Sequence, residues 1–244
     1  MTGKSYIGTS GWNYKQWKDG FYAGVPQKDW LRYNSRQFSG LEVNGSFYRL
    51  LNKDTIERWY EQTPDDFRFA SKGHRFVTHN KKLADIEASL ELQRTSVADL
   101  RQKLAVVLWQ LPRQSKKNVA RLQGFAEALG SWPEVRHALE FRNVSWFDDE
   151  VAGCLTDHDL AVVLSDAADW PMWTCVTTNL VYVRLHGYPR TYVSAYDASA
   201  LDNWATRIKN WLDEARDVHV YFDNDAEGAA PFDALKLITR LEGH

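Results

Sequence analysis

The sequence has only two cysteines, Cys154 and Cys175, and they do not form a Cys-x-x-Cys motif. Two isolated thiols supply neither the repeated ligand pairs of a zinc cluster nor the disulfide framework of a small secreted domain. We therefore expect both cysteines to be reduced packing residues. Stability then depends on a hydrophobic core, and a chain of 244 residues with 44% hydrophobic residues can form one as a single domain, residues 1–244.

Long apolar runs and a strong excess of charge are also missing. No stretch approaches the ~20 apolar residues needed to span a bilayer, and residues 1–5 lead directly into a predicted strand. The sequence therefore predicts a cytoplasmic protein with no membrane partner. The formal net charge of -2 removes the main reason to expect nonspecific nucleic-acid binding, so a small-molecule ligand is favoured.

Eight short runs of β-branched, aromatic or aliphatic residues predict strands. They cover residues 6–10, 40–44, 67–71, 105–109, 138–141, 161–165, 180–186 and 218–222. Helical periodicity fills most of the gaps between them. This alternation of strands and helices predicts the α/β fold class, and eight such units predict a single (β/α)8 TIM barrel.

Two local features refine this prediction. The helical segment 119–129 is preceded by Ser115, the expected N-cap, and is followed by Gly130, the expected C-terminal glycine. Residues 167–178 contain Pro171 and lack a helical period, so we expect the sixth helix of the barrel to be degenerate, either short or replaced by a loop.

Polar side chains gather where the predicted strands end. Alternation along each strand assigns one face to the following residues: Glu42, Asn44, Lys72, Glu140, Arg142, Asp166, Arg184, His186 and Asp223. The C-terminal ends of barrel strands converge on one opening, so these side chains are expected to meet there. Buried charges must be paired or line a wet pocket, and several charges together favour the pocket. For any one residue, a simple ion pair remains the alternative.

The one surplus in composition is tryptophan, with eleven residues. Large aromatic side chains usually pack and cap the ends of a barrel, and this explains most of them. Only Trp12 and Trp146, which lie beside polar strand ends, are predicted to contact a ligand.

Several motifs resemble, in order and over essentially the whole chain, those of the YecE-like family. They are residues 7–12 with Tyr14 and Trp17, 21–22, 41–44 with 46–48, 78–79, 110–112, 140–142 with 145–146, 182–187 with Tyr192 and Tyr196, and 221–224 with Gly228. The resemblance implies a TIM barrel of unknown function that is loosely described as related to sugar isomerases. The chain departs from the family at Asp223, where an asparagine is usual, and before Gln110, where a Gly-Pro pair is missing.

A metal-free acid–base site fits these residues best, with no cofactor. In this hypothesis Arg184 and Arg142 clamp a small anionic, sugar-like ligand. Either Glu42 or Glu140 is the base, and either His186 or Lys72 is the acid or electrophile. The other predicted substrate-binding residues are Ser10, Trp12, Asn44, Tyr48, His79, Gln110, Trp146, Asp166, Tyr192, Asp223 and Asn224. The loop 188–196 is either a lid or packing over the barrel end.

Three other functions remain open, and a fourth is disfavoured. A metal-dependent isomerase or hydrolase would use Glu140, Asp166, His186 and Asp223 as ligands, a set that resembles xylose-isomerase-like barrels. A noncatalytic sensor of small molecules would bind without turnover. A nucleic-acid-binding or nucleic-acid-processing protein would stack bases on the aromatic residues and hold phosphates with Lys72, Arg75, Arg142, Arg184 and Arg190. Glycoside hydrolysis is disfavoured because Gln110 stands where the familiar barrel glycosidases carry a carboxylate.

Overall fold

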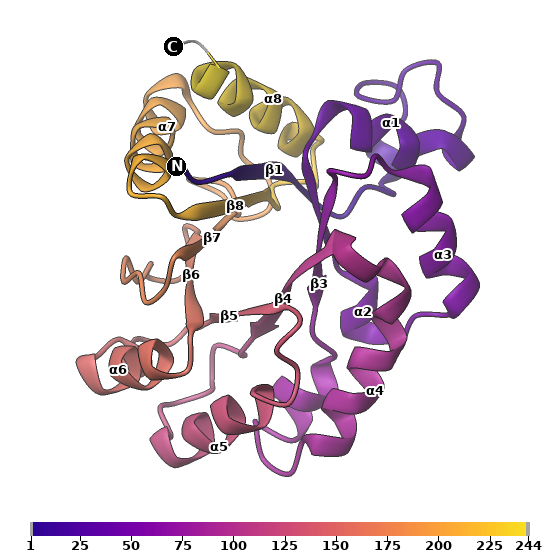
Figure 1. Ribbon diagram of the computed structural model, residues 1–244. Helices are drawn as coiled ribbons and strands as arrows, with labels where there is room; N and C mark the ends of the chain where they lie inside the picture. Colours follow the sequence, from indigo (N-terminus) through magenta and orange to yellow (C-terminus); the bar gives the residue numbers. More distant parts are fainter. Residues whose placement is uncertain (1, 243–244) are drawn as a thin grey trace.

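A computed structural model describes residues 2–242 of the protein. Eight parallel strands form a closed barrel in sequence order, with the first strand paired to the last. The strands are β1 (Ser5–Ser10), β2 (Gly40–Val43), β3 (Arg68–Lys72), β4 (Leu104–Gln110), β5 (Arg136–Glu140), β6 (Leu160–Asp166), β7 (Leu180–Leu185) and β8 (Asp217–Phe222). The predicted TIM barrel is confirmed, and each predicted strand is present (Figure 1).

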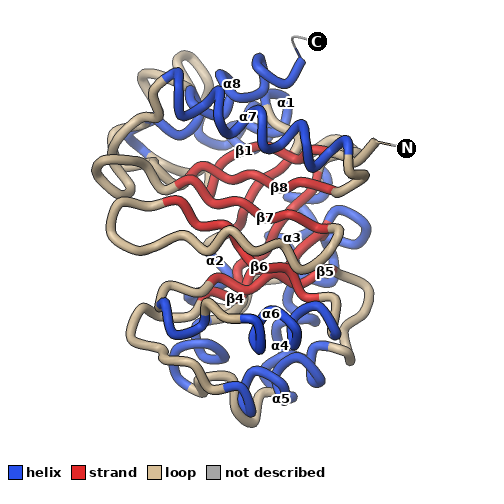
Figure 2. The backbone as a smooth tube through the Cα atoms, turned by 90° about the vertical axis from the view of Figure 1, so that its left-hand side faces the viewer, coloured by secondary structure: helices blue, strands red, loops and turns tan. Residues whose placement is uncertain are grey.

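Helices surround the strands on the outside of the barrel (Figure 2). They are α1 (Trp30–Gln37), α2 (Gly45–Tyr48), α3 (Lys53–Gln62), α4 (Glu87–Val97), α5 (Val119–Leu129), α6 (Asp149–Asp157), α7 (Ala198–Asp213) and α8 (Ala229–Glu242). Residues 167–179, between β6 and β7, form no helix, as the sequence predicts. Along residues 2–242, no helix has the length and apolar content to cross a membrane.

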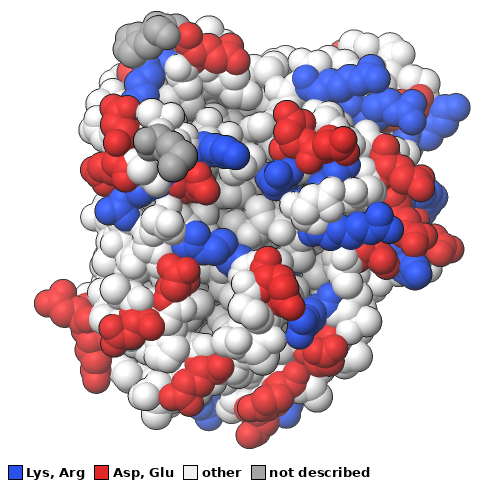
Figure 3. Space-filling view, viewed as in Figure 1, with Lys and Arg blue, Asp and Glu red and all other residues white. Residues whose placement is uncertain are grey.

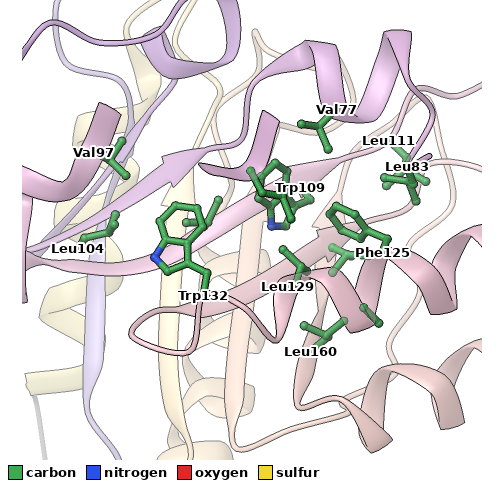
Figure 4. Close-up of a cluster of buried hydrophobic side chains, with 14 of the residues drawn as sticks. Val77, Leu83, Val97, Leu104, Trp109, Leu111, Phe125, Leu129, Trp132 and Leu160 are labelled. Carbon is green, nitrogen blue, oxygen red and sulfur yellow. The ribbon is translucent and has the colours of Figure 1, made fainter. Parts of the chain in front are cut away.

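The core has an inner and an outer layer because strand side chains alternate between the two faces. Small and apolar side chains fill the barrel interior, among them Ala70, Leu108 and Ala161. Outward-facing side chains pack against the helices. In Figure 4, Trp109 of β4 lies against Phe125 of α5, and their rings meet edge to face with centroids 5.4 Å apart. This packing holds the strands in register and fixes where their polar ends lie.

Of the two predicted caps of α5, the N-cap is wrong, whereas the glycine at the C-terminal end is confirmed. The N-cap is Asn118, whose side chain accepts a hydrogen bond from the backbone N–H of Arg121. Ser115 lies three residues earlier, where its carbonyl accepts from the indole of Trp146. Gly130 directly follows Leu129 and is the C-cap, with a φ of -57° in place of the left-handed conformation common for such a glycine.

Gly73 directly follows β3 and touches the core. A Cβ atom at this position would lie 2.2 Å from Cε3 of the buried Trp109. We expect Gly73→Ala to lower the free energy of unfolding by about 2 kcal/mol, because the indole ring cannot move aside in a packed interior. Chemical denaturation measures this. Gly124→Ala on α5 is the matched control, since a Cβ there meets no atom within 4 Å; it is expected to stabilise by about 0.5–1 kcal/mol. Equal effects of the two variants would contradict the packing at Gly73.

Candidate functional site

Arg184 of β7 lies at the centre of a network of buried charges at the C-terminal end of the barrel. Its guanidinium donates to Glu42 twice, over 3.0 Å from Nε and 2.7 Å from Nη2. It also donates to Glu140 over 2.8 Å and to Asp223 over 3.0 Å. The side chain is only 1% exposed. One arginine from β7 therefore joins carboxylates at the ends of β2, β5 and β8.

The two glutamates use both carboxylate oxygens within this network. Glu42 also accepts from the hydroxyls of Ser10 and Tyr182, over 2.5 and 2.7 Å. Glu140 accepts from Arg142 over 2.6 Å and from Ser165 over 3.1 Å. Both glutamates are fully buried. Every oxygen is thus held by a donor of the protein itself.

These contacts change the role that the sequence predicts for three residues. Burial alone raises the pKa of Glu140, but the charges of Arg142 and Arg184 outweigh it and hold the pKa well below its usual value. A carboxylate so stabilised is a weak base. The geometry therefore favours Glu42, Glu140 and Arg184 as a rigid framework. It does not favour Arg184 as a ligand clamp, because its donors face the protein.

A pocket of about 380 Å³ opens beside this network. It is lined by Tyr14, Asn44, Phe47, Tyr48, Lys72, Arg184, Tyr192 and Asp223. Besides Arg184, four predicted substrate-binding residues and one predicted catalytic residue line this cavity. They are Asn44, Tyr48, Tyr192 and Asp223, and Lys72. The size of the cavity suits a small ligand.

Lys72, at the end of β3, is the unusual residue of this pocket. Among the described residues, no acceptor makes a hydrogen bond or ion pair with its Nζ atom, which lies 4.6 Å from the centre of the Phe47 ring. Burial and the nearby Arg184 lower the pKa of the amine from 10.5 to about 8, although Glu140, Glu42 and Asp223 oppose the change. The amine therefore faces the pocket and exchanges its proton near neutral pH.

His186 lies behind the pocket and is fully buried. Its Nε2 is 3.4 Å from Nη1 of Arg184, and its Nδ1 is 2.9 Å from Oδ2 of Asp223. The arginine donates to Nε2, so Nδ1 carries the proton and faces the carboxylate, although this N–H is not aligned as a hydrogen bond. Burial and Arg184 lower the pKa of His186, which makes the neutral ring its resting form.

Arg142 forms the rim on the side of the β5 end. Besides Glu140, it donates to the hydroxyl of Tyr192 over 3.2 Å, and its guanidinium carbon lies 4.1 Å from the centre of the Trp170 ring. These contacts tie the loop that carries Tyr192 to the barrel. Of the predicted lid, Tyr192 is the residue that reaches the pocket.

The remaining predicted residues divide between the pocket and its surroundings. Ser10 does not line the pocket but holds a residue that does, since its hydroxyl accepts a hydrogen bond from the side chain of Asn44 over 2.8 Å. Trp12 lies in an adjoining groove of about 400 Å³, where it meets Trp59 edge to face. Tyr14 and Asn44 line both cavities, so the groove and the pocket lie side by side.

Three predicted residues lie away from the central pocket. His79 and Trp146 line another cavity of about 300 Å³, between the short helical turn Phe76–Asn80 and the start of α5. Gln110 ends β4, where its amide donates to the carbonyl of Leu111 over 2.8 Å. None of these side chains lines the pocket around Lys72.

Two predicted substrate-binding residues, Asp166 and Asn224, face outward. Asp166 accepts from the indole of Trp204 on α7, and the inner position at the end of β6 belongs to Ser165 instead. Asn224 donates to Asp233 of α8. The prediction for Asp166 is wrong because the alternation on β6 was assigned to the opposite face. Among residues 2–242, no cluster of three or more His, Cys, Asp or Glu side chains is arranged to hold a metal ion.

Tyr14, Phe47 and Asp225 are site residues that the prediction missed. Tyr14 and Phe47 occur inside the motifs that carry the family resemblance, so the signal was present. Asp225 follows β8, beyond the strand, where alternation gives no information. Burial and the charge of Asp223 raise its pKa from 3.8 to about 6, and its side chain contacts Tyr14.

The raised pKa of Asp225 predicts a pH-dependent effect on stability. A carboxyl whose pKa is higher in the folded state favours folding below pH 4, and this contribution is lost as the pH rises through about 6. We expect Asp225→Asn to raise the free energy of unfolding by about 1–2 kcal/mol at pH 8, after allowance for its partial exposure. Urea denaturation at pH 8 and pH 4 tests this. A gain of the same size at both pH values would contradict it.

Known proteins resemble this chain over most of its length. The model of the family described as "Protein of unknown function DUF72" matches residues 6–244. The UPF0759 protein YunF of Bacillus subtilis is 25% identical, over 97% of this chain and 94% of its own. The UPF0759 protein YecE of Escherichia coli is 27% identical, over 58% of this chain and 50% of its own.

Solved structures agree with this assignment. The crystal structure of the DUF72 protein TM1631 from Thermotoga maritima is similar with a TM-score of 0.89 and 26% identity, and the match covers 98% of this chain and 99% of that one. A glycoside hydrolase of family 5 from Prevotella bryantii is similar in fold alone, with a TM-score of 0.51 and 9% identity over 98% of this chain and 95% of that one. The chain belongs to the DUF72 family, the YecE-like family of TIM barrels whose function is unknown.

Proposed function

We propose that this protein is an enzyme that binds a small anionic, sugar-like substrate in the central pocket and transforms it by acid–base chemistry. The observation that carries the proposal is the amine of Lys72, which lines the pocket and has no acceptor within residues 2–242. A lysine held in this way, with a pKa of about 8, can both attract an anion and move a proton near neutral pH.

The other lining groups suit a polyol. The hydroxyls of Tyr48 and Tyr192 and the amide of Asn44 offer donors and acceptors around the amine. Asp223 is the carboxylate in the wall, and its side chain is 12% exposed. Against the effect of burial, Arg184 lowers the pKa of Asp223 as well, but Asp223 lines the pocket. Glu42 and Glu140 do not line it, so Lys72 and Asp223 form the candidate acid–base pair.

One face of the molecule gives no support to nucleic-acid binding. On the face drawn in Figure 3, lysine and arginine side chains are interspersed with aspartate and glutamate side chains, and no continuous basic tract crosses it. Several cations of the predicted phosphate contacts are engaged elsewhere, such as Arg190 with Glu227 and Arg142 with Glu140. Binding of a phosphate backbone needs many free cations together.

A thermal-shift screen tests the proposal. Wild type, Lys72→Met and the control Lys116→Met are screened against sugar phosphates, sugar acids, neutral sugars and short oligonucleotides. A ligand at 100 times its Kd stabilises by about 2.7 kcal/mol. We expect stabilisation by sugar acids or phosphates in the wild type and in Lys116→Met, and none in Lys72→Met.

Two results would count against the proposal. Stabilisation by oligonucleotides alone, fading steeply as salt rises, would favour the nucleic-acid alternative. Stabilisation by a sugar acid without any reaction would favour a sensor. Loss of carbon-bound proton signals of the ligand in D2O, followed by NMR, separates the enzyme from the sensor.

A further inference from the structure

Lys72 has the features of a nucleophile as well as those of a proton carrier. The backbone around it is fixed, because its carbonyl accepts from the Ser46 hydroxyl over 2.7 Å and the N–H of Gly73 donates to Leu108 over 2.8 Å. The side chain extends from this rigid strand end over the Phe47 ring into the pocket. A nucleophile held at a fixed place on a barrel strand is the arrangement that covalent catalysis requires.

Lys103, which is buried where Lys72 is only partly so, shows the contrast. Lys103 is 1% exposed, and its amine donates to the carbonyls of Tyr60 and Thr63 over 2.7 and 2.8 Å. It is a structural lysine with its donors in use. Lys72 has no such partners among the described residues, so its nitrogen lone pair is available once a proton leaves.

We propose that Lys72 forms an imine with the carbonyl group of the substrate, which is then an open-chain aldose or ketose or a keto acid. This inference rests on the proposed function and specifies how the same site acts. At pH 7 about one amine in ten is neutral when the pKa is 8, against about three in ten thousand at 10.5.

The step balances without an oxidant or reductant. The nitrogen lone pair attacks the carbonyl carbon, a C–N bond forms, and the C–O π pair moves to the oxygen. Both nitrogen protons end on that oxygen as the C–O bond breaks, and water leaves. Asp223 and the Tyr192 hydroxyl line the same pocket and can relay these protons.

The surrounding charges suit the product. The imine nitrogen then takes up the proton that the lysine ammonium released before the attack and becomes a cation, and the negative charges of Glu140, Glu42 and Asp223 act on this nitrogen. The protonated imine withdraws electrons from the adjacent carbon, and the proton on that carbon becomes acidic enough for a carboxylate to remove. The imine therefore explains how a weak base such as Asp223 can be sufficient.

Reductive trapping tests the inference. Folded wild type is incubated at pH 7 with glycolaldehyde, pyruvate or glyceraldehyde 3-phosphate and sodium cyanoborohydride, and modified lysines are located by peptide mass mapping. We expect the peptide with Lys72 to be labelled at least about 10-fold faster than the peptide with the exposed Lys116. Lys72→Met removes the fast label, and Lys116→Met retains it.

Labelling of Lys72 at or below the rate of Lys116, with all three compounds, overturns the imine. If the Lys72-dependent thermal shift persists in that case, the acid–base function stands without it. If that shift is also absent, both proposals fail. Fast labelling of Lys72 that a stabilising sugar acid slows supports both.

Discussion

Arg184→Met is expected to lower the free energy of unfolding by about 4 kcal/mol or more. Arg184 is the shared partner of Glu42, Glu140 and Asp223, and it is almost fully buried. Removing one partner of a buried ion pair costs about 3–5 kcal/mol because a charge is left without compensation. Here three carboxylates lose their common cation, so the loss lies at or above the top of that range.

The pH dependence of this loss has a definite sign. In the wild type the pKa values of Glu140 and Asp223 are lowered, mainly by arginine charges acting against burial, so their contribution is present above about pH 4 and is lost on acidification. Without Arg184, burial acts on both carboxyls with less opposition, since Arg142 still holds Glu140, and their pKa values rise. The difference between wild type and variant therefore shrinks as the pH falls from 7 to 5.

Urea denaturation at the two pH values measures both effects. Arg190→Met is the matched control, because Arg190 is exposed and its contact with Glu227 is 3.4 Å long. We expect it to change stability by less than about 0.5 kcal/mol. A loss of the same small size in Arg184→Met would show that the charge network does not support the barrel.

Lys72→Met is expected to have the opposite effect on stability and to abolish function. The lowered pKa means that the folded state resists protonation of the partly buried amine, so the wild type gains stability as the pH rises from about 8 to 10.5. Removing the amine at pH 7 is expected to raise the free energy of unfolding by about 2–3 kcal/mol. The methionine side chain also fits against Phe47.

Lys103→Met separates this effect from a general preference for apolar residues. Its amine satisfies two buried carbonyls, so the variant is expected to lose about 1–3 kcal/mol. Stability measurements on the two variants at pH 7 and pH 10.5 make the comparison. Destabilisation by Lys72→Met at pH 7 would show that the amine has partners in the folded protein. A gain in stability with loss of ligand response marks a residue kept for function.

Most of the barrel was predictable from the sequence because its strands bury both faces. Segments such as 161–165 and 218–222 are short and apolar, and their spacing leaves room for helices between them. The missing helix after β6 was also predictable, because residues 167–178 contain Pro171 and lack a helical period. The N-cap of α5 was not, since Ser115 and Asn118 are both acceptable N-cap residues and only the path of the chain decides between them.

The candidate site was predictable only in part. Alternation correctly brought Lys72, Arg184 and Asp223 together, but it placed Asp166 on the wrong face, because a one-residue error in phase reverses every side chain. Which charges neutralise one another depends on distances across the barrel. Sequence alone therefore could not show that Arg184 is fully engaged and that Lys72 is not.

The most direct test of the account is the titration of Lys72. Lysine labelled with ¹³C at Cε is followed by NMR from pH 6 to 11, and the signal is assigned by its loss in Lys72→Met. The account predicts a midpoint at about pH 8, well below the 10.5 of an ordinary lysine. A midpoint at 10.5 or above would contradict it, because the amine would then be solvated or paired and neither acid–base chemistry nor imine formation would follow.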